Sequence, residues 1–98
     1  AECPETTFVL GHAGALDSDQ GLELQLRHAN AVLEVSCISL SQLRRVIDRG
    51  DPDRIVYGTD WPFYHHALAL AKVLVATEGR PALRRKILHD NAARLLGL

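Results

Sequence analysis

The chain has 98 residues, of which 47% are hydrophobic and 23% charged, and its 11 Lys and Arg nearly balance its 12 Asp and Glu. This length allows one domain over residues 1–98, and the apolar content excludes an intrinsically disordered chain. The formal net charge of −1 gives no electrostatic basis for binding nucleic acid or a membrane surface, so we expect neither partner.

The cysteine content and the start of the chain bear on its location. No apolar run reaches the roughly 18 residues of a membrane span, and the first residues do not form a signal segment. Cys3 and Cys37 are too few for a disulfide scaffold and form no CxxC pair, so we expect a cytoplasmic protein. Because the chain begins at Ala1 and contains no Met, we also expect either a removed initiator or a piece of something longer.

Three apolar runs predict β-strands. They cover residues 6–10, 31–37 and 54–58; the first is stopped by Gly11, and the third follows a turn over residues 50–53. Each run is apolar almost without interruption, as in strands that are covered on both faces of a parallel sheet.

Four amphipathic stretches predict helices between and after the strands. They cover residues 19–29, residues 39 to about 50, about 65–77, and the chain from Arg80 onward, where Pro81 suits a first turn. Ser39 and Gln42 form a capping box at the start of the second helix. The positions expected on the apolar sides are Leu22, Leu26 and Ala29, then Leu40, Leu43 and Ile47, then Leu68, Leu70, Ala71, Leu74 and Val75, and finally Leu83, Ile87, Leu88, Leu95 and Leu96.

The predicted order β-α-β-α-β-α-α indicates an α/β fold with a parallel sheet and right-handed crossovers. Ligands of such sheets bind at the C-terminal ends of the strands. Alternation along the three strands places His12, Ser36 and Asp60 at these ends, where they can converge. An imidazole and a carboxylate together suit a metal ion or a general base that acts on water.

Structural interpretations of the same three residues stay open. A single His at a strand end is commonly a structural residue with satisfied hydrogen bonds. An Asp that precedes an aromatic residue and Pro is commonly a turn or helix cap, and Ser36 suits a capping or turn hydroxyl equally well. The three residues at matched strand ends favour a site, but their spacing alone does not define a reaction.

Other polar and aromatic residues near the strand ends also have both a functional and a structural interpretation. Glu34 lies in an apolar strand, so we expect it to pair with an Arg or His inside a barrel rather than to act in catalysis. We expect Cys37 to be a buried thiol. Trp61, with Ser36, is the candidate substrate-binding residue, although core packing also explains it. His65 and His66 suit an exposed helix start better than a second metal site.

Several segments together resemble the amidohydrolase-related family, the branch of the amidohydrolase superfamily that includes aminocarboxymuconate-semialdehyde decarboxylase. They are FVLGHAG at residues 8–14, VLEVS at 32–36, DRIVYGTDWP at 53–62 and KILHDNAARLL at 86–96. The resemblance covers essentially the whole chain, and the combination of GTDWP with HDNAARLL is its most specific part.

The resemblance implies a (β/α)8 barrel, of which this chain would supply strands six, seven and eight with their helices. It implies that His12 activates water or orients the substrate, and that Asp60 binds a divalent metal, usually zinc, and handles a proton. Some family members work without a metal and use this aspartate as the base. The implied activity is hydrolysis or decarboxylation of a small molecule.

The chain also departs from the family pattern. The His-x-His pair of the first strand and the His of the fifth strand have no counterpart here, and three strands cannot close a barrel of eight. We therefore expect the isolated chain to be inactive or weakly active, and we expect the partial barrel to be completed by self-association through its strand edges or by a complementary barrel fragment. The alternative is a non-catalytic fragment that assembles into a barrel-like oligomer and retains vestigial site residues.

Overall fold

The computed structural model describes residues 2–14 and 17–98. The strands are β1 (Phe8–Leu10), β2 (Ala31–Glu34) and β3 (Ile55–Val56), and the helices are α1 (Ser18–Arg27), α2 (Leu40–Arg49), α3 (His66–Ala76), α4 (Pro81–Arg85) and α5 (Asn91–Leu95). Short turns of helix lie between them: η1 (Gly11–Ala13), η2 (Pro52–Arg54) and η3 (Lys86–Asp90), the last being a π-type turn that joins α4 to α5.

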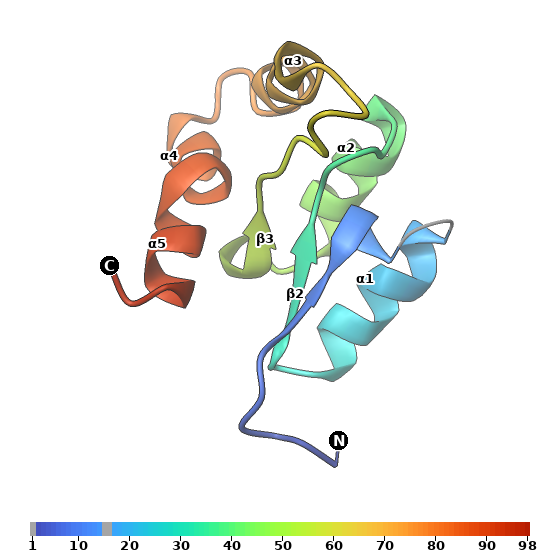
Figure 1. The fold of residues 1–98 in the computed structure, drawn as a ribbon, viewed down its shortest axis with the longest axis vertical. Helices are drawn as coiled ribbons and strands as arrows, with labels where there is room; N and C mark the ends of the chain where they lie inside the picture. The colour runs from blue at the N-terminus through green and yellow to red at the C-terminus, as the bar shows by residue number, and fades with distance from the viewer. Residues whose placement is uncertain (1, 15–16) are drawn as a thin grey trace.

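The three strands form one parallel sheet in the order β1-β2-β3, which confirms the predicted α/β fold (Figure 1). Val9 pairs with Val32 across the first ladder, and Glu34 pairs with Val56 across the second. The strands are shorter than predicted: β1 begins at Phe8 rather than at residue 6, and β2 and β3 end at Glu34 and Val56, before their apolar runs end. Their C-terminal ends all point toward α3.

The core lies between the sheet and its helices. Leu33 and Ile55 of the central and third strands are fully buried and pack in one cluster with Leu43 and Val46 of α2 and Ile87 of η3. The predicted capping box is present, since Ser39 Oγ accepts from the Gln42 backbone N–H while the Gln42 side chain accepts from the Ser39 N–H.

Several predicted apolar faces are wrong. On α3 only Val73 is buried, whereas the predicted stripe is mostly exposed, with Leu68 at 47% and Val75 at 47%. Leu26 and Leu96 are also exposed. The helical period was correct in each case, but no element of the described chain covers these sides.

Polar side chains bind α5 and the neighbouring turns to the N-terminal ends of β2 and β3. The buried Asn91 side chain donates to the carbonyls of Pro52 and Ile55, both at 2.8 Å. Arg54 donates to the carbonyls of His28 and Ala31.

None of the helices in residues 2–14 and 17–98 combines the length and the apolar character that a membrane crossing requires.

Candidate functional site

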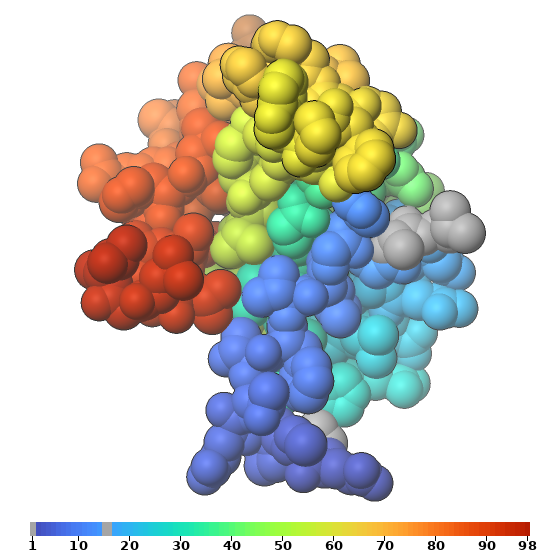
Figure 2. Space-filling model, viewed as in Figure 1, coloured from blue at the N-terminus to red at the C-terminus, as the bar shows by residue number. Residues whose placement is uncertain are grey.

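His12, Ser36 and Asp60 come together at the C-terminal ends of the strands, as predicted. His12 lies in η1 directly after β1, and its Nδ1 is 2.9 Å from Ser36 Oγ, which follows β2. Asp60 follows β3. The segment around it, yellow in Figure 2, lies over the ends of β1 and β2. Polar residues from three loops therefore lie together at the C-terminal end of the sheet.

Cys37 joins this group, which the sequence did not predict. Its side chain is exposed rather than buried, and its thiol donates to Asp60 Oδ2 at 2.9 Å. One ligand-type atom from each of His12, Cys37 and Asp60 lies within 4.8 Å of the others. We call these three residues the donor cluster. The expectation of a buried thiol fails because β2 ends at Glu34, so strand alternation no longer orients residue 37.

Glu34 lies beneath the donor cluster and organises the two loops above it. Its Oε1 accepts from the Ser36 backbone N–H at 2.8 Å, and its Oε2 accepts from the His12 N–H at 3.1 Å and the Ser36 hydroxyl at 2.9 Å. The predicted pairing with an Arg or His side chain is therefore wrong. The chain turns out of the strand conformation here, so these N–H groups need an acceptor, and the carboxylate provides it.

These hydrogen bonds assign the proton of the His12 ring. Nδ1 is 3.1 Å from the Ser36 carbonyl oxygen, which can only accept, and 2.9 Å from the Ser36 hydroxyl, whose proton goes to Glu34. Nδ1 therefore carries the hydrogen, and the lone pair of the neutral ring is on Nε2. A nitrogen with a free lone pair can bind a metal or accept a proton from water.

The electrostatics of the cluster are set by its carboxylates. The pKa of the Cys37 thiol is raised to about 11, first by partial desolvation and then by its hydrogen bond to Asp60 and by the charges of Asp60 and Glu34. The negative potential that disfavours a thiolate would favour a cation at the same place.

Trp61 lies at the rim of this region. It is 63% exposed, and its ring centroid is 6.1 Å from that of His65 and 5.9 Å from that of His66. His65 Nδ1 accepts from the Ala67 N–H and caps α3, which confirms the prediction of an exposed helix start. Ser36 is buried, at 3% exposure. Its hydroxyl therefore contacts the His12 ring rather than the solvent.

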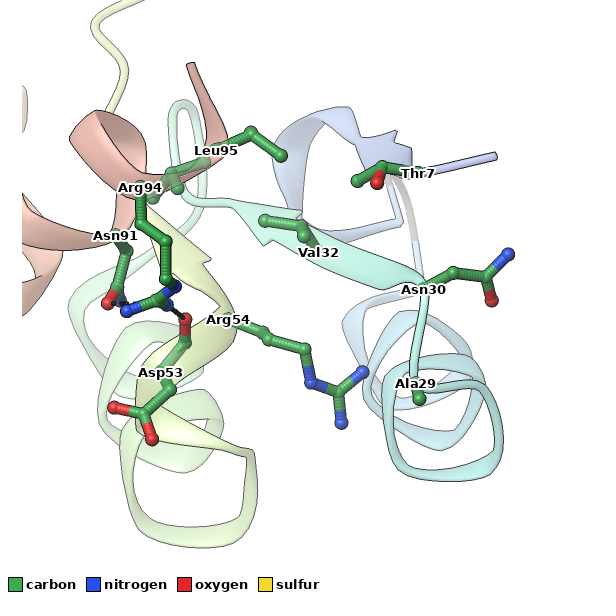
Figure 3. Close-up of a pocket in the computed structure, with 10 residues that line it drawn as sticks. Thr7, Ala29, Asn30, Val32, Asp53, Arg54, Asn91, Arg94 and Leu95 are labelled. Atoms are coloured by element: carbon green, nitrogen blue, oxygen red, sulfur yellow. Dashed lines mark hydrogen bonds between the residues drawn. The ribbon is translucent and has the colours of Figure 1, made fainter. Parts of the chain in front are cut away.

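Cavities lie at both ends of the sheet. One of about 350 Å³ lies beside Cys37 and is bordered by Thr59, Tyr64 and Lys72 among others. The other, of about 290 Å³, lies between α5 and the N-terminal ends of the strands (Figure 3). The guanidinium groups of Arg54 and Arg94 at this second cavity donate to backbone carbonyls. The first cavity is lined by Cys37 and so adjoins the donor cluster.

Parallel strands flanked by helices, with polar side chains gathered at the carboxyl ends, are the arrangement found in part of an α/β barrel. The family model described as Amidohydrolase matches residues 1–98. The chain belongs to the amidohydrolase family, as its motifs suggested; the narrower resemblance to the decarboxylase branch stays a prediction.

A solved structure of similar fold supports the architecture. The crystal structure of an amidohydrolase from Burkholderia multivorans with bound zinc has a TM-score of 0.71 and 22% sequence identity, and the similarity covers 95% of this chain and 44% of that protein. The chain thus spans less than half the length of that relative. A search for curated relatives finds no match.

Proposed function

We propose that this chain carries part of the active site of a metal-dependent hydrolase or decarboxylase of the amidohydrolase type. The observation that carries the proposal is the approach of His12 and Asp60, whose ligand atoms lie within 4.8 Å although their strands are separated by β2. Family membership over residues 1–98 supports the same reaction class.

Each of the two residues has a defined role in this proposal. Asp60 holds the divalent metal and receives the proton released during the reaction, and His12 Nε2 orients or deprotonates the attacking water. A zinc ion bound here would lower the pKa of that water and polarise the substrate. The donor set fits zinc, which accepts imidazole nitrogen, thiolate sulfur and carboxylate oxygen, and the similar amidohydrolase from Burkholderia multivorans has bound zinc.

The substrate would be a small molecule bound between the donor cluster and the rim. Trp61 offers an exposed ring for one side of it, and Ser36 acts on it through the position of His12. The cavity of about 350 Å³ beside Cys37 has the size of a small-ligand site. A family barrel has eight strands and the described sheet has three, so we expect the isolated chain to be weakly active or inactive.

The test is hydrolysis of ester and amide substrates by the purified chain, with and without zinc. Zinc-dependent turnover that is abolished in Asp60→Ala and retained in Asp48→Ala supports the proposal. Asp48 is a suitable control because it is an exposed carboxylate on α2 whose ion-pair partner is Arg80. Turnover that is unchanged in Asp60→Ala contradicts the assignment.

A second function, assembly without catalysis, is supported by the exposed first strand. Phe8 is 46% and Val9 49% exposed, and β1 and β3 form the two edges of the sheet. Such edges pair readily with another chain. We propose that a second copy or a complementary barrel fragment covers them, and that in this case the site residues are vestigial. Metal-independent assembly combined with no turnover would favour this function.

A further inference from the structure

We propose that Cys37 is a metal ligand, and that the donor cluster of His12, Cys37 and Asp60 binds one thiophilic divalent cation such as Zn²⁺ within this chain. The inference deepens the proposed function, since it concerns the same end of the sheet. Metal binding can nevertheless be measured without any turnover.

The first argument is the chemistry of the donors. Each residue contributes a different atom type, and zinc sites in proteins are built from such nitrogen, sulfur and oxygen ligands. The carbonyl oxygen and the hydroxyl of Ser36 occupy Nδ1 of His12, so Nε2 is the nitrogen that the ring offers. Catalytic zinc takes three protein ligands and leaves a position for water, and the cluster has three.

The second argument is distance. Ligand atoms bound to zinc at 2.0–2.3 Å in tetrahedral geometry lie about 3.5 Å apart. One ring nitrogen of His12, Cys37 Sγ and one carboxylate oxygen of Asp60 lie within 4.8 Å of one another, so a small rearrangement that presents Nε2 and contracts the cluster by about 1 Å is sufficient. Cys37 Sγ and Asp60 Oδ2 are already in contact at 2.9 Å, and the exposed Cys37 side chain has room to turn.

The third argument is charge. The carboxylates of Asp60 and Glu34 lie close to the thiol, and no Lys or Arg forms an ion pair with either of them among the residues that the structure describes. A divalent cation would compensate this negative charge.

The fourth argument is backbone conformation. His12, Cys37 and Asp60 have φ angles of 55°, 61° and 59°, in the left-handed region that non-glycine residues rarely adopt. The only other such residue in the described chain is Ala13, which is adjacent to His12. Strained residues of this kind collect at functional sites. All three donors have this strained backbone, which indicates that the positions of their side chains serve a function such as metal binding.

Cobalt absorption spectroscopy tests the assignment, because a thiolate bound to Co²⁺ gives an intense charge-transfer band that nitrogen and oxygen ligands do not. The purified 98-residue chain is titrated with Co²⁺, and Zn²⁺ is then added to displace it. We expect one equivalent of Co²⁺, a thiolate band, and loss of the band with Zn²⁺. Cys37→Ser should remove the band and weaken binding at least about tenfold.

Cys3→Ser is the matched control, since Cys3 is the other free cysteine, is also exposed and lies before β1. This variant should keep both the band and the affinity. His12→Gln and Asp60→Asn should each weaken binding by a similar factor, and circular dichroism verifies that every variant is folded. A thiolate band that survives in Cys37→Ser, or an affinity that is unchanged in either His12→Gln or Asp60→Asn, overturns the three-donor site.

The two proposals fail separately. A thiolate band without turnover leaves the metal site in place, and the absence of turnover then bears only on catalysis by the isolated chain, which we expect to be weak or absent. Zinc-dependent turnover without a thiolate band supports the proposed function and overturns the role of Cys37.

Discussion

The carboxylate of Glu34 connects the backbone of two loops to the ring of His12. It accepts three hydrogen bonds, from the N–H groups of His12 and Ser36 and from the Ser36 hydroxyl. No charge of opposite sign is required for this, because donors that lack a partner in the sheet are sufficient. The residue is therefore a positioning residue for the donor cluster.

Glu34→Gln tests this role. The amide has the size of the carboxylate, but one oxygen is replaced by an NH₂ group that faces donors, so we expect a loss of about 1–3 kcal/mol in the free energy of unfolding. The variant should also weaken the preference of His12 for a protonated Nδ1. Urea unfolding measures the first effect and nitrogen NMR of the imidazole the second. A variant with unchanged stability and tautomer would contradict the assignment.

Gly58 shows how closely the segment after β3 approaches the carboxylate of Glu34. A Cβ at this position would lie 2.0 Å from Glu34 Oε1, so Gly58→Ala must displace the carboxylate. We expect a destabilisation of about 1–3 kcal/mol by overpacking, measured by urea unfolding.

Gly11→Ala is the control for this prediction, because its Cβ would lie 3.9 Å from Glu34 Oε2, an ordinary contact. Its effect should stay within about 0.5 kcal/mol. Equal effects of the two substitutions would show that the carboxylate can move freely.

At the scale of single elements, the turn before β3 depends on an ion pair. Asp51 is bonded to Arg54 at 2.9 Å and accepts from the Asp53 N–H. The hydrogen bond of Arg54, followed by that of the Asp53 N–H, lowers the pKa of Asp51 in the folded chain. A lowered folded pKa means that the contribution to stability is present above the unfolded pKa, about 3.9, and is lost as the pH falls through the folded value.

Asp51→Asn should therefore destabilise the chain at pH 7 by up to about 1 kcal/mol, since the pair is partly exposed. The difference from the unsubstituted chain should shrink as the pH falls below about 4. Denaturant unfolding at a series of pH values measures it. A difference that is constant with pH would show that the charge of Asp51 is not involved.

The elements could be predicted from the sequence more fully than the faces they bury. Apolar runs and the capping residues Ser39 and Gln42 identify strands and helices because these signals are local. Whether a helix face is covered depends on parts of the chain that are distant in sequence. Leu68 and Leu96 were therefore predicted to lie in apolar interfaces, but both are exposed. The same holds for the site. The alternation of side chains along the strands predicted that His12 and Asp60 lie close together. It could not predict the position of Cys37, because this residue lies in a left-handed conformation after the end of β2.

At the scale of the whole molecule, the proposed self-association depends on the edge of β1. Val9→Lys places a charge on this exposed strand, which discourages edge pairing, and we expect a shift toward the monomer in sedimentation experiments. Leu26→Lys is the control, because Leu26 is exposed to a similar extent, 57% against 49%, but lies on α1. A monomeric parent chain, or equal dissociation by both variants, would contradict assembly through the strand edge.

The left-handed backbone at the donor cluster has a consequence for the stability of the chain. Cys37→Ala and Cys37→Gly both remove the thiol, but glycine adopts the φ of 61° without the cost that a Cβ imposes, about 1 kcal/mol. Thermal unfolding should therefore find the glycine variant more stable than the alanine variant, the reverse of the usual order within a helix. The cysteine at position 37 therefore carries a conformational cost that a glycine at the same position would not carry.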